Sequence, residues 1–164
     1  MKASINAVKK PEIFDDDEMN RNVQVLCQRL LTETMNDPPN TERAYSISLE
    51  NLKGDIENIT RSKGADGEGT VSIQELDVPF MSIHNHPSGE TFSAKDVHLF
   101  CGHPNEMMMA VIGNNGKIYA LEKTRNYSVK WIKLQLAIED LNDDNIGDIV
   151  FGKAEEYGLR YYEI

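Results

Sequence analysis

One stretch decides how this chain folds: it reads Ser82-Ile-His-Asn-His-Pro-Ser-Gly-Glu-Thr-Phe-Ser-Ala-Lys-Asp96. Its first part belongs to an apolar run and predicts a buried strand over 78–86. Proline and glycine at 87–89 predict a turn. A serine followed three residues later by an aspartate then predicts a helix over 93–100. The stretch therefore indicates a strand, a turn and a helix in succession.

The segments before this stretch predict a helix followed by a strand hairpin. An acidic run over 15–18 precedes apolar side chains that recur at helical steps, and Pro38-Pro39 ends the pattern. Those apolar residues are Met19, Val23, Leu26 and Leu30. Apolar residues then alternate over 44–49 and, more loosely, over 55–60, which predicts two paired strands. The glycines of 64–69 predict a flexible connection.

The segments after the stretch predict a second hairpin, helices and a last strand. Asn114-Asn115-Gly116 joins two apolar segments, 107–112 and 117–121, and these residue types accept the positive φ of tight turns. A helix is predicted over 131–141, and a further helical stretch leads to a last strand over 159–164. Together the elements predict a single α+β domain with a mixed, mostly antiparallel sheet flanked by helices.

Length and composition agree with one folded domain. The chain has 164 residues, of which 40% are hydrophobic and 27% charged, close to the averages for globular proteins. We divide it into an N-terminal leader and helix over 1–39 and a main domain with C-terminal helices over 40–164. We expect 1–39 to pack on the domain; the alternatives are that it covers the substrate groove or contacts another protein. Because no apolar run suits a membrane span or a secretory signal, we expect a cytoplasmic protein outside the membrane.

Charge and cysteine usage exclude further classes. Lys and Arg number 17 against 27 Asp and Glu, which gives a net charge of −10. Such a surface repels a phosphate backbone, so nucleic acid is not an expected partner. Cys27 and Cys101 stand outside any Cys-x-x-Cys pair, which argues against structural zinc or redox chemistry. We expect both cysteines to be small buried apolar residues.

The histidines of the opening stretch predict a metal site. Side chains two apart on a strand point to one face, so His84 and His86 would present their imidazoles together. Asp96, in the first turn of the next helix, would add a carboxylate oxygen. Two histidines, one carboxylate and an open fourth position are typical of catalytic zinc. The simpler alternatives are a hydrogen-bonded histidine pair and a capping box made by Ser93 and Asp96.

These residues resemble the signature of a known family. His84-Asn85-His86-Pro87 with Ser93 and Asp96 is similar to the JAMM or MPN-plus zinc metalloproteases, whose pattern is an upstream glutamate, His-x-His-Pro and Ser-x-x-Asp. The continuation Ser88-Gly89 also resembles the RadC branch and the JAMM domains of phage and prophage proteins. The resemblance covers 40–125 and implies a JAMM fold of the cytidine-deaminase-like kind. One departure is that the turn between His86 and Ser93 is one residue shorter than the family commonly has.

The resemblance also implies roles for individual residues. His84, His86 and Asp96 would bind Zn²⁺, and Ser93 would help to hold the oxyanion of the tetrahedral intermediate. Glu42, before the first alternating segment, matches the family's general base, which takes a proton from the attacking water and returns it to the leaving nitrogen. Two alternatives remain open, one for the general base and one for an additional zinc ion.

Glu50 is the reserve candidate for the general base. An auxiliary zinc near His98 or His103 is the second alternative, although neither histidine is expected among the main ligands. Met107-Met108-Met109 is expected to belong to the core or the sheet surface.

Three functions fit these expectations. The first is a zinc-dependent peptidase or isopeptidase that hydrolyses an amide bond of a protein or peptide substrate. The second is a non-catalytic MPN-like protein-binding module. The third is a RadC-like metallohydrolase acting on another bond. An HNH nuclease is disfavoured, because that motif spreads its residues over a hairpin and a helix and because the chain is acidic. The sequence leaves the oligomeric state open.

Overall fold

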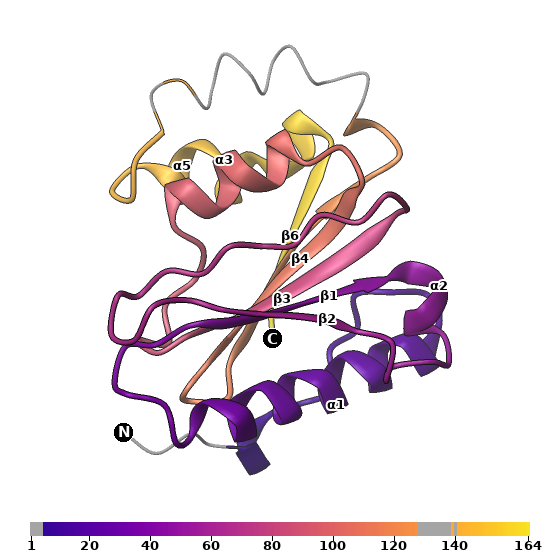
Figure 1. Cartoon of the computed structure of the whole chain (residues 1–164). Coiled ribbons are helices and arrows are strands. Elements are labelled where there is room, and N and C mark those ends of the chain that lie inside the picture. The colour runs from indigo at the N-terminus through magenta and orange to yellow at the C-terminus, as the bar shows by residue number, and fades with distance from the viewer. Residues whose placement is uncertain (1–4, 128–138, 140) are drawn as a thin grey trace.

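The computed structural model describes residues 5–127, 139 and 141–164, and within these residues six strands form one sheet (Figure 1). The strands are β1 (Arg43–Ser48), β2 (Thr60–Lys63), β3 (Phe80–His86), β4 (Glu106–Gly113), β5 (Ile118–Lys123) and β6 (Leu159–Glu163). Their order in the sheet is β2-β1-β3-β4-β5-β6. The pair β3 and β4 is parallel, whereas the other neighbours are antiparallel. The predicted α+β class with a mixed, mostly antiparallel sheet is confirmed.

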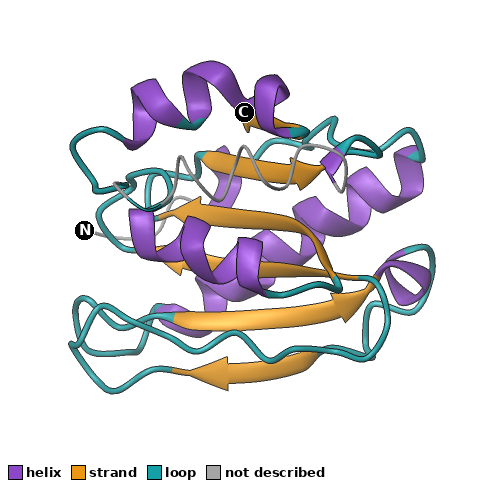
Figure 2. Cartoon of the chain, turned by 90° about the horizontal axis from the view of Figure 1, so that it is seen from above, coloured by secondary structure: helices purple, strands orange, loops and turns teal. Residues whose placement is uncertain are grey.

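Helices cover both faces of this sheet. They are α1 (Asp17–Thr34), α2 (Leu49–Leu52), α3 (Ala94–Gly102) and α5 (Ile146–Ile149), followed by a 3₁₀ segment (Phe151–Tyr157). The helix α1 lies on one face, and α3 and α5 lie on the other (Figure 1). Figure 2, which views the sheet from the side of α3, shows this helix over the middle strands. Apart from 139 and 141, the helix predicted over 131–141 lies outside the described residues.

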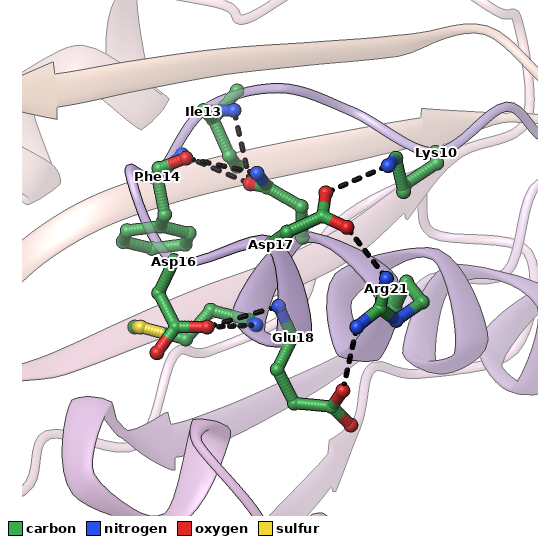
Figure 3. A network of polar contacts seen from close by, with 9 residues as sticks. Lys10, Ile13, Phe14, Asp16, Asp17, Glu18 and Arg21 are labelled. Atoms are coloured by element: carbon green, nitrogen blue, oxygen red, sulfur yellow. Dashed lines mark hydrogen bonds and ion pairs between the residues drawn. The ribbon is translucent and has the colours of Figure 1, made fainter.

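The N-terminal segment packs on the sheet. Asp16 caps α1 by accepting hydrogen bonds from the backbone N–H groups of its first turn, and Lys10 and Arg21 both pair with Asp17 (Figure 3). The apolar side chains of α1 enter one buried cluster together with Val8, Ile13 and residues of the strands. The described part of 1–39 therefore covers the face opposite α3.

The first hairpin is displaced from its predicted place. The strand paired with β1 is β2, which begins at Thr60, so the strand predicted over 55–60 is wrong. The segment 55–59 instead forms a turn, in which the N–H of Asn58 donates to the carbonyl of Asp55. Ile56 and Ile59 still pack against the core beneath the sheet. The loose alternation of apolar residues in this segment thus comes from two isoleucines that pack on the core from a turn, not from a strand.

The unit β3-α3-β4 places the histidines and the aspartate of the opening stretch on one face of the sheet. Along β3, Met81 and Ile83 enter the core on the α1 side. Because side chains alternate along a strand, His84 and His86 point to the other face, where α3 lies. The parallel pairing of β3 with β4 requires a crossover, which α3 supplies. The fold therefore sets the start of α3 against the end of β3.

Several further expectations along the chain are confirmed. The second hairpin is formed by β4 and β5, and Gly116 in its turn has a φ of 83°. The last strand, β6, pairs with β5. Cys27 and Cys101 are buried free thiols. Met108 and Met109 are buried in β4. In the part of the chain described here, the helices lack the length and apolar character needed to cross a bilayer.

Candidate metal centre

The end of β3 and the first turn of α3 bring the three predicted ligands together. His84 is 2% exposed, and its Nε2 lies 3.0 Å from the Nε2 of His86. Asp96 faces both rings: its Oδ2 is 3.2 Å from Nε2 of His86 and its Oδ1 is 3.6 Å from Nε2 of His84. The shorter turn over 87–92 therefore still delivers the carboxylate to the histidines.

These separations fit one small cation. Two atoms that each lie about 2.0–2.1 Å from a tetrahedral zinc are about 3.3 Å apart, and imidazole nitrogen and carboxylate oxygen are donors that zinc accepts. The measured distances of 3.0, 3.2 and 3.6 Å bracket this value. Glu42 is a second carboxylate nearby, since its oxygen and the ring nitrogens of His84 and His86 all lie within 4.8 Å of one another. Asp96 contacts both Nε2 atoms, so Asp96 and Glu42 are both placed to complete a ligand set with the two histidines.

The hydrogen bonds of the rings favour a cation between them. Nδ1 of His86 lies 2.9 Å from the carbonyl oxygen of Glu90. A carbonyl can only accept, so Nδ1 carries the proton and a neutral His86 turns its Nε2 lone pair toward His84. Two Nε2 atoms at 3.0 Å can share at most one proton. A metal ion would satisfy both lone pairs and the adjacent carboxylate.

Burial and charge shift the protonation of the acidic groups in opposite directions. Burial alone would raise the pKa of Asp96, but the two imidazoles outweigh it and hold this pKa well below its usual range. Burial raises the pKa of Glu42, because the attraction of His84 and His86 offsets it only in part. Asp96 therefore stays ionised as a ligand should, and Glu42 is the carboxyl group more ready to take up a proton. These directions describe the metal-free protein, since a bound cation would lower the pKa of its neighbours.

Asn85, between the two histidines, positions the segment that carries Glu42. Its Oδ1 accepts from the N–H of Arg43 at 2.6 Å, and its Nδ2 donates to the carbonyl of Thr41 at 3.1 Å. The register of β1 and β3 pairs Ala44 with His84. Sequence reasoning missed this role, although an asparagine inside an apolar strand was a usable signal.

Ser93 and Asp96 also form the capping box that was the simpler alternative. The Oγ of Ser93 accepts from the N–H of Asp96 at 3.1 Å, and Oδ2 of Asp96 accepts from the N–H of Ser93 at 2.9 Å. The cap thus fixes the rotamer of the same carboxylate that faces the histidines. Asp143, which the sequence did not single out, accepts from the N–H of Ala94 at 2.8 Å and secures the same helix start.

A large cavity opens beside these groups. Its volume is about 790 Å³, and Glu42, His86, Ser93 and Asp96 line it. The segment Gly69–Val71 forms another part of its wall. This segment is attached to the residues just before Glu42, because the N–H of Gly69 donates to the carbonyl of Asn40 at 2.8 Å. All five predicted site residues thus lie at one cavity or directly behind it.

The reserve residues lie elsewhere. Glu50 sits on α2, past the far end of β1, with its side chain 85% exposed and paired with Lys53. The structure therefore contradicts Glu50 as a general base at this site. His98 is exposed on α3. His103 follows the C-terminal end of α3 and contacts the buried carboxylate of Glu106 at 2.8 Å.

Comparison of the chain with protein-family models gave no match, and comparisons with curated proteins and with solved structures also gave none.

Proposed function

We propose that this chain is a zinc-dependent peptidase or isopeptidase of the JAMM type that hydrolyses an amide bond of a protein or peptide. The observation that carries the proposal is the convergence of His84, His86 and Asp96 within 3.0–3.6 Å, with the buried carboxyl group of Glu42 beside the two histidines. A zinc ion bound there would act as a Lewis acid that lowers the pKa of a water molecule and polarises the substrate carbonyl.

The chain's own side chains would divide the remaining work. Glu42 takes a proton from the attacking water and passes it to the leaving nitrogen. The hydroxyl of Ser93 donates a hydrogen bond to the oxygen on which negative charge develops. The hydrogen bond from Nδ1 of His86 to Glu90 keeps the Nε2 lone pair of this ring directed at the centre.

The cavity supports a substrate of peptide size. A volume of about 790 Å³ is in the range of sites that bury most of a drug-sized molecule. Its wall combines the polar site residues with apolar groups, among them Val71, Leu99 and Tyr119. Such a wall suits an extended chain segment whose amide bond lies at the histidines while its side chains contact the apolar surface.

The test compares two conservative variants in zinc-loaded protein. Glu42→Gln should keep the fold and the zinc but lose hydrolysis of a peptide library and of isopeptide-linked substrates, analysed by mass spectrometry, because an amide cannot shuttle the proton. Glu50→Gln, the matched control at an exposed glutamate, should cleave as well as the wild type. Equal cleavage by Glu42→Gln would contradict the assigned role of Glu42. Absence of cleavage by the zinc-loaded wild type across both substrate classes would contradict the proposed activity.

A further inference from the structure

A second, much smaller cavity lies beside His84 and next to the large one, with which it shares Val71, Asp96 and Leu99 in its wall. Its volume is about 10 Å³, close to the space that one water molecule needs. Most of its wall is apolar, from residues such as Leu99, Phe100 and Met109. Three polar residues also reach it: His84, Asp96 and Glu106. A single water with several polar partners is the occupant that such a cavity suits.

His84, which lines this cavity, carries an unpartnered polar atom. Its Nε2 faces His86 and Asp96, whereas its Nδ1 is buried and has no hydrogen-bond partner among the described residues. If the Nε2 lone pair points to a metal, Nδ1 must carry the proton of the neutral ring. A buried N–H without an acceptor is costly, and metal-binding histidines generally donate this proton to a carboxylate, a carbonyl or a water.

Glu106, which also lines the cavity, offers an acceptor. The residue is 1% exposed, and its Oε2 accepts from the hydroxyl of Ser82 at 2.6 Å. Its Oε1 contacts Nδ1 of His103 at 2.8 Å. Each carboxylate oxygen can accept two hydrogen bonds, so Glu106 retains acceptor capacity. Ser82 and His84 are two apart on β3, so Glu106 lies on the face to which His84 points.

We propose that one water fills this cavity, accepts a hydrogen bond from Nδ1 of His84 and donates one to the carboxylate of Glu106. Glu106 is then a positioning residue: through the water it fixes the tautomer and the orientation of His84, without touching the metal or the substrate. This inference rests on the proposed metal centre and extends it to a buried network of Ser82, Glu106 and His103. Loss of such outer contacts typically weakens metal binding about 10–100-fold.

The first test uses the wild-type protein and therefore does not depend on a variant that folds. A high-resolution crystal structure of the zinc-loaded protein should show a water within hydrogen-bond distance of Nδ1 of His84 and of a Glu106 oxygen. Nitrogen-15 NMR of the imidazoles should show His84 protonated at Nδ1. A dry cavity, or a His84 ring protonated at Nε2, would overturn the inference.

The second test measures zinc affinity by competition with a chelator. Glu106→Met removes both acceptor oxygens and should weaken zinc binding about tenfold or more. Glu57→Met is the matched control, because it makes the same replacement at a glutamate outside the network, whose side chain is 76% exposed and paired with Arg29; its affinity should stay within about twofold of the wild type. Equal affinity of folded Glu106→Met and wild type would overturn the inference. A wild-type protein that holds the bridging water but binds no zinc would contradict the proposed function and leave the water site supported.

Discussion

Asn85 holds Glu42 in place through hydrogen bonds to the two residues that flank Glu42 in the chain. Its side chain accepts from the N–H of Arg43 at 2.6 Å and donates to the carbonyl of Thr41 at 3.1 Å. Since Asn85 lies between His84 and His86 on β3, one side chain ties the two histidines to the segment that carries the glutamate. The middle residue of the His-x-His pattern is thus part of the site's scaffold. The first prediction follows from this arrangement.

Replacing Asn85 with alanine should separate metal binding from catalysis. The variant leaves the buried carbonyl of Thr41 and the partly buried N–H of Arg43 without these partners, which should cost about 1–3 kcal/mol in the free energy of unfolding. Zinc affinity should stay close to that of the wild type, because the three ligands are untouched, while hydrolysis falls as Glu42 loses its fixed position. Urea unfolding, chelator competition and peptide cleavage measure the three quantities. Asn36→Ala, at an exposed asparagine, is the control, and unchanged cleavage by Asn85→Ala would show that Glu42 needs no such support.

Two variants of Ser93 should distinguish its cap from its chemistry. Ser93→Ala removes the N-cap of α3 and should lower the free energy of unfolding by about 1 kcal/mol, whereas Ser93→Gly should cost only a few tenths. Both lack the hydroxyl, so both should lose about 10²-fold or more in turnover if this group stabilises the oxyanion. Ser93→Thr should restore stability and turnover together. If cleavage by the glycine variant matches that of the wild type, Ser93 is a cap alone.

The ion pair of Asp37 and Arg43 predicts a pH-dependent part of stability next to the site. The side-chain hydrogen bond from Arg43 holds the pKa of Asp37 below its usual value of 3.8, and burial opposes this only in part. A lowered folded-state pKa contributes stability that is present above about pH 4 and lost as the pH falls through the folded pKa. Asp37→Asn should therefore destabilise the protein by about 1–2 kcal/mol at pH 7 and by little at pH 2. An equal loss at both pH values, or a similar pattern for the exposed control Asp55→Asn, would contradict the assignment.

Zinc should stabilise the fold, and acid should remove this effect. At a free zinc concentration of 100 times the dissociation constant, the free energy of unfolding should rise by about 2.7 kcal/mol. In the metal-free protein, burial lowers the pKa of His86, but the hydrogen bond and the charge of Asp96 raise it by more. The pKa of His86 therefore lies above its usual value of 6.5. This raised pKa stabilises the metal-free fold below pH 6.5 and ceases to do so as the pH rises through it. Protons therefore compete with zinc near neutrality, and the melting shift caused by zinc should shrink from pH 8 to pH 5.5; a shift independent of pH would exclude histidine ligands.

The sequence was most informative where several local signals agreed. The strand, turn and helix around His84 and Asp96 carry an apolar run, turn residues and a cap within a few positions, and all three elements formed as predicted. By contrast, the strand predicted over 55–60 rested on loose alternation alone, which a turn with two apolar contacts satisfies equally well. Local pattern therefore predicted the elements that bring His84, His86 and Asp96 together, but not the strand at the edge of the sheet.

The contacts that complete the site come from residues distant in sequence. The bonds of Asn85 to Thr41 and Arg43 span more than forty residues, and that of Asp143 to Ala94 spans 49. No local spacing encodes such pairs, because they depend on strand register and on how the C-terminal helices dock. Glu42 and Glu50 lie beyond opposite ends of β1, and only this placement in the structure separates the two candidates for the general base.

Zinc content is the measurement that tests the central claim most directly. Protein stripped with a chelator and dialysed against zinc should retain about one ion per chain by elemental mass spectrometry, held through two imidazoles and one carboxylate. His86→Ala and Asp96→Ala should lose this ion, while Asp143→Asn, which changes the other carboxylate at the start of α3, should retain it. A wild-type chain that retains no zinc, or an Asp96→Ala variant that binds it as tightly as the wild type, would contradict the account.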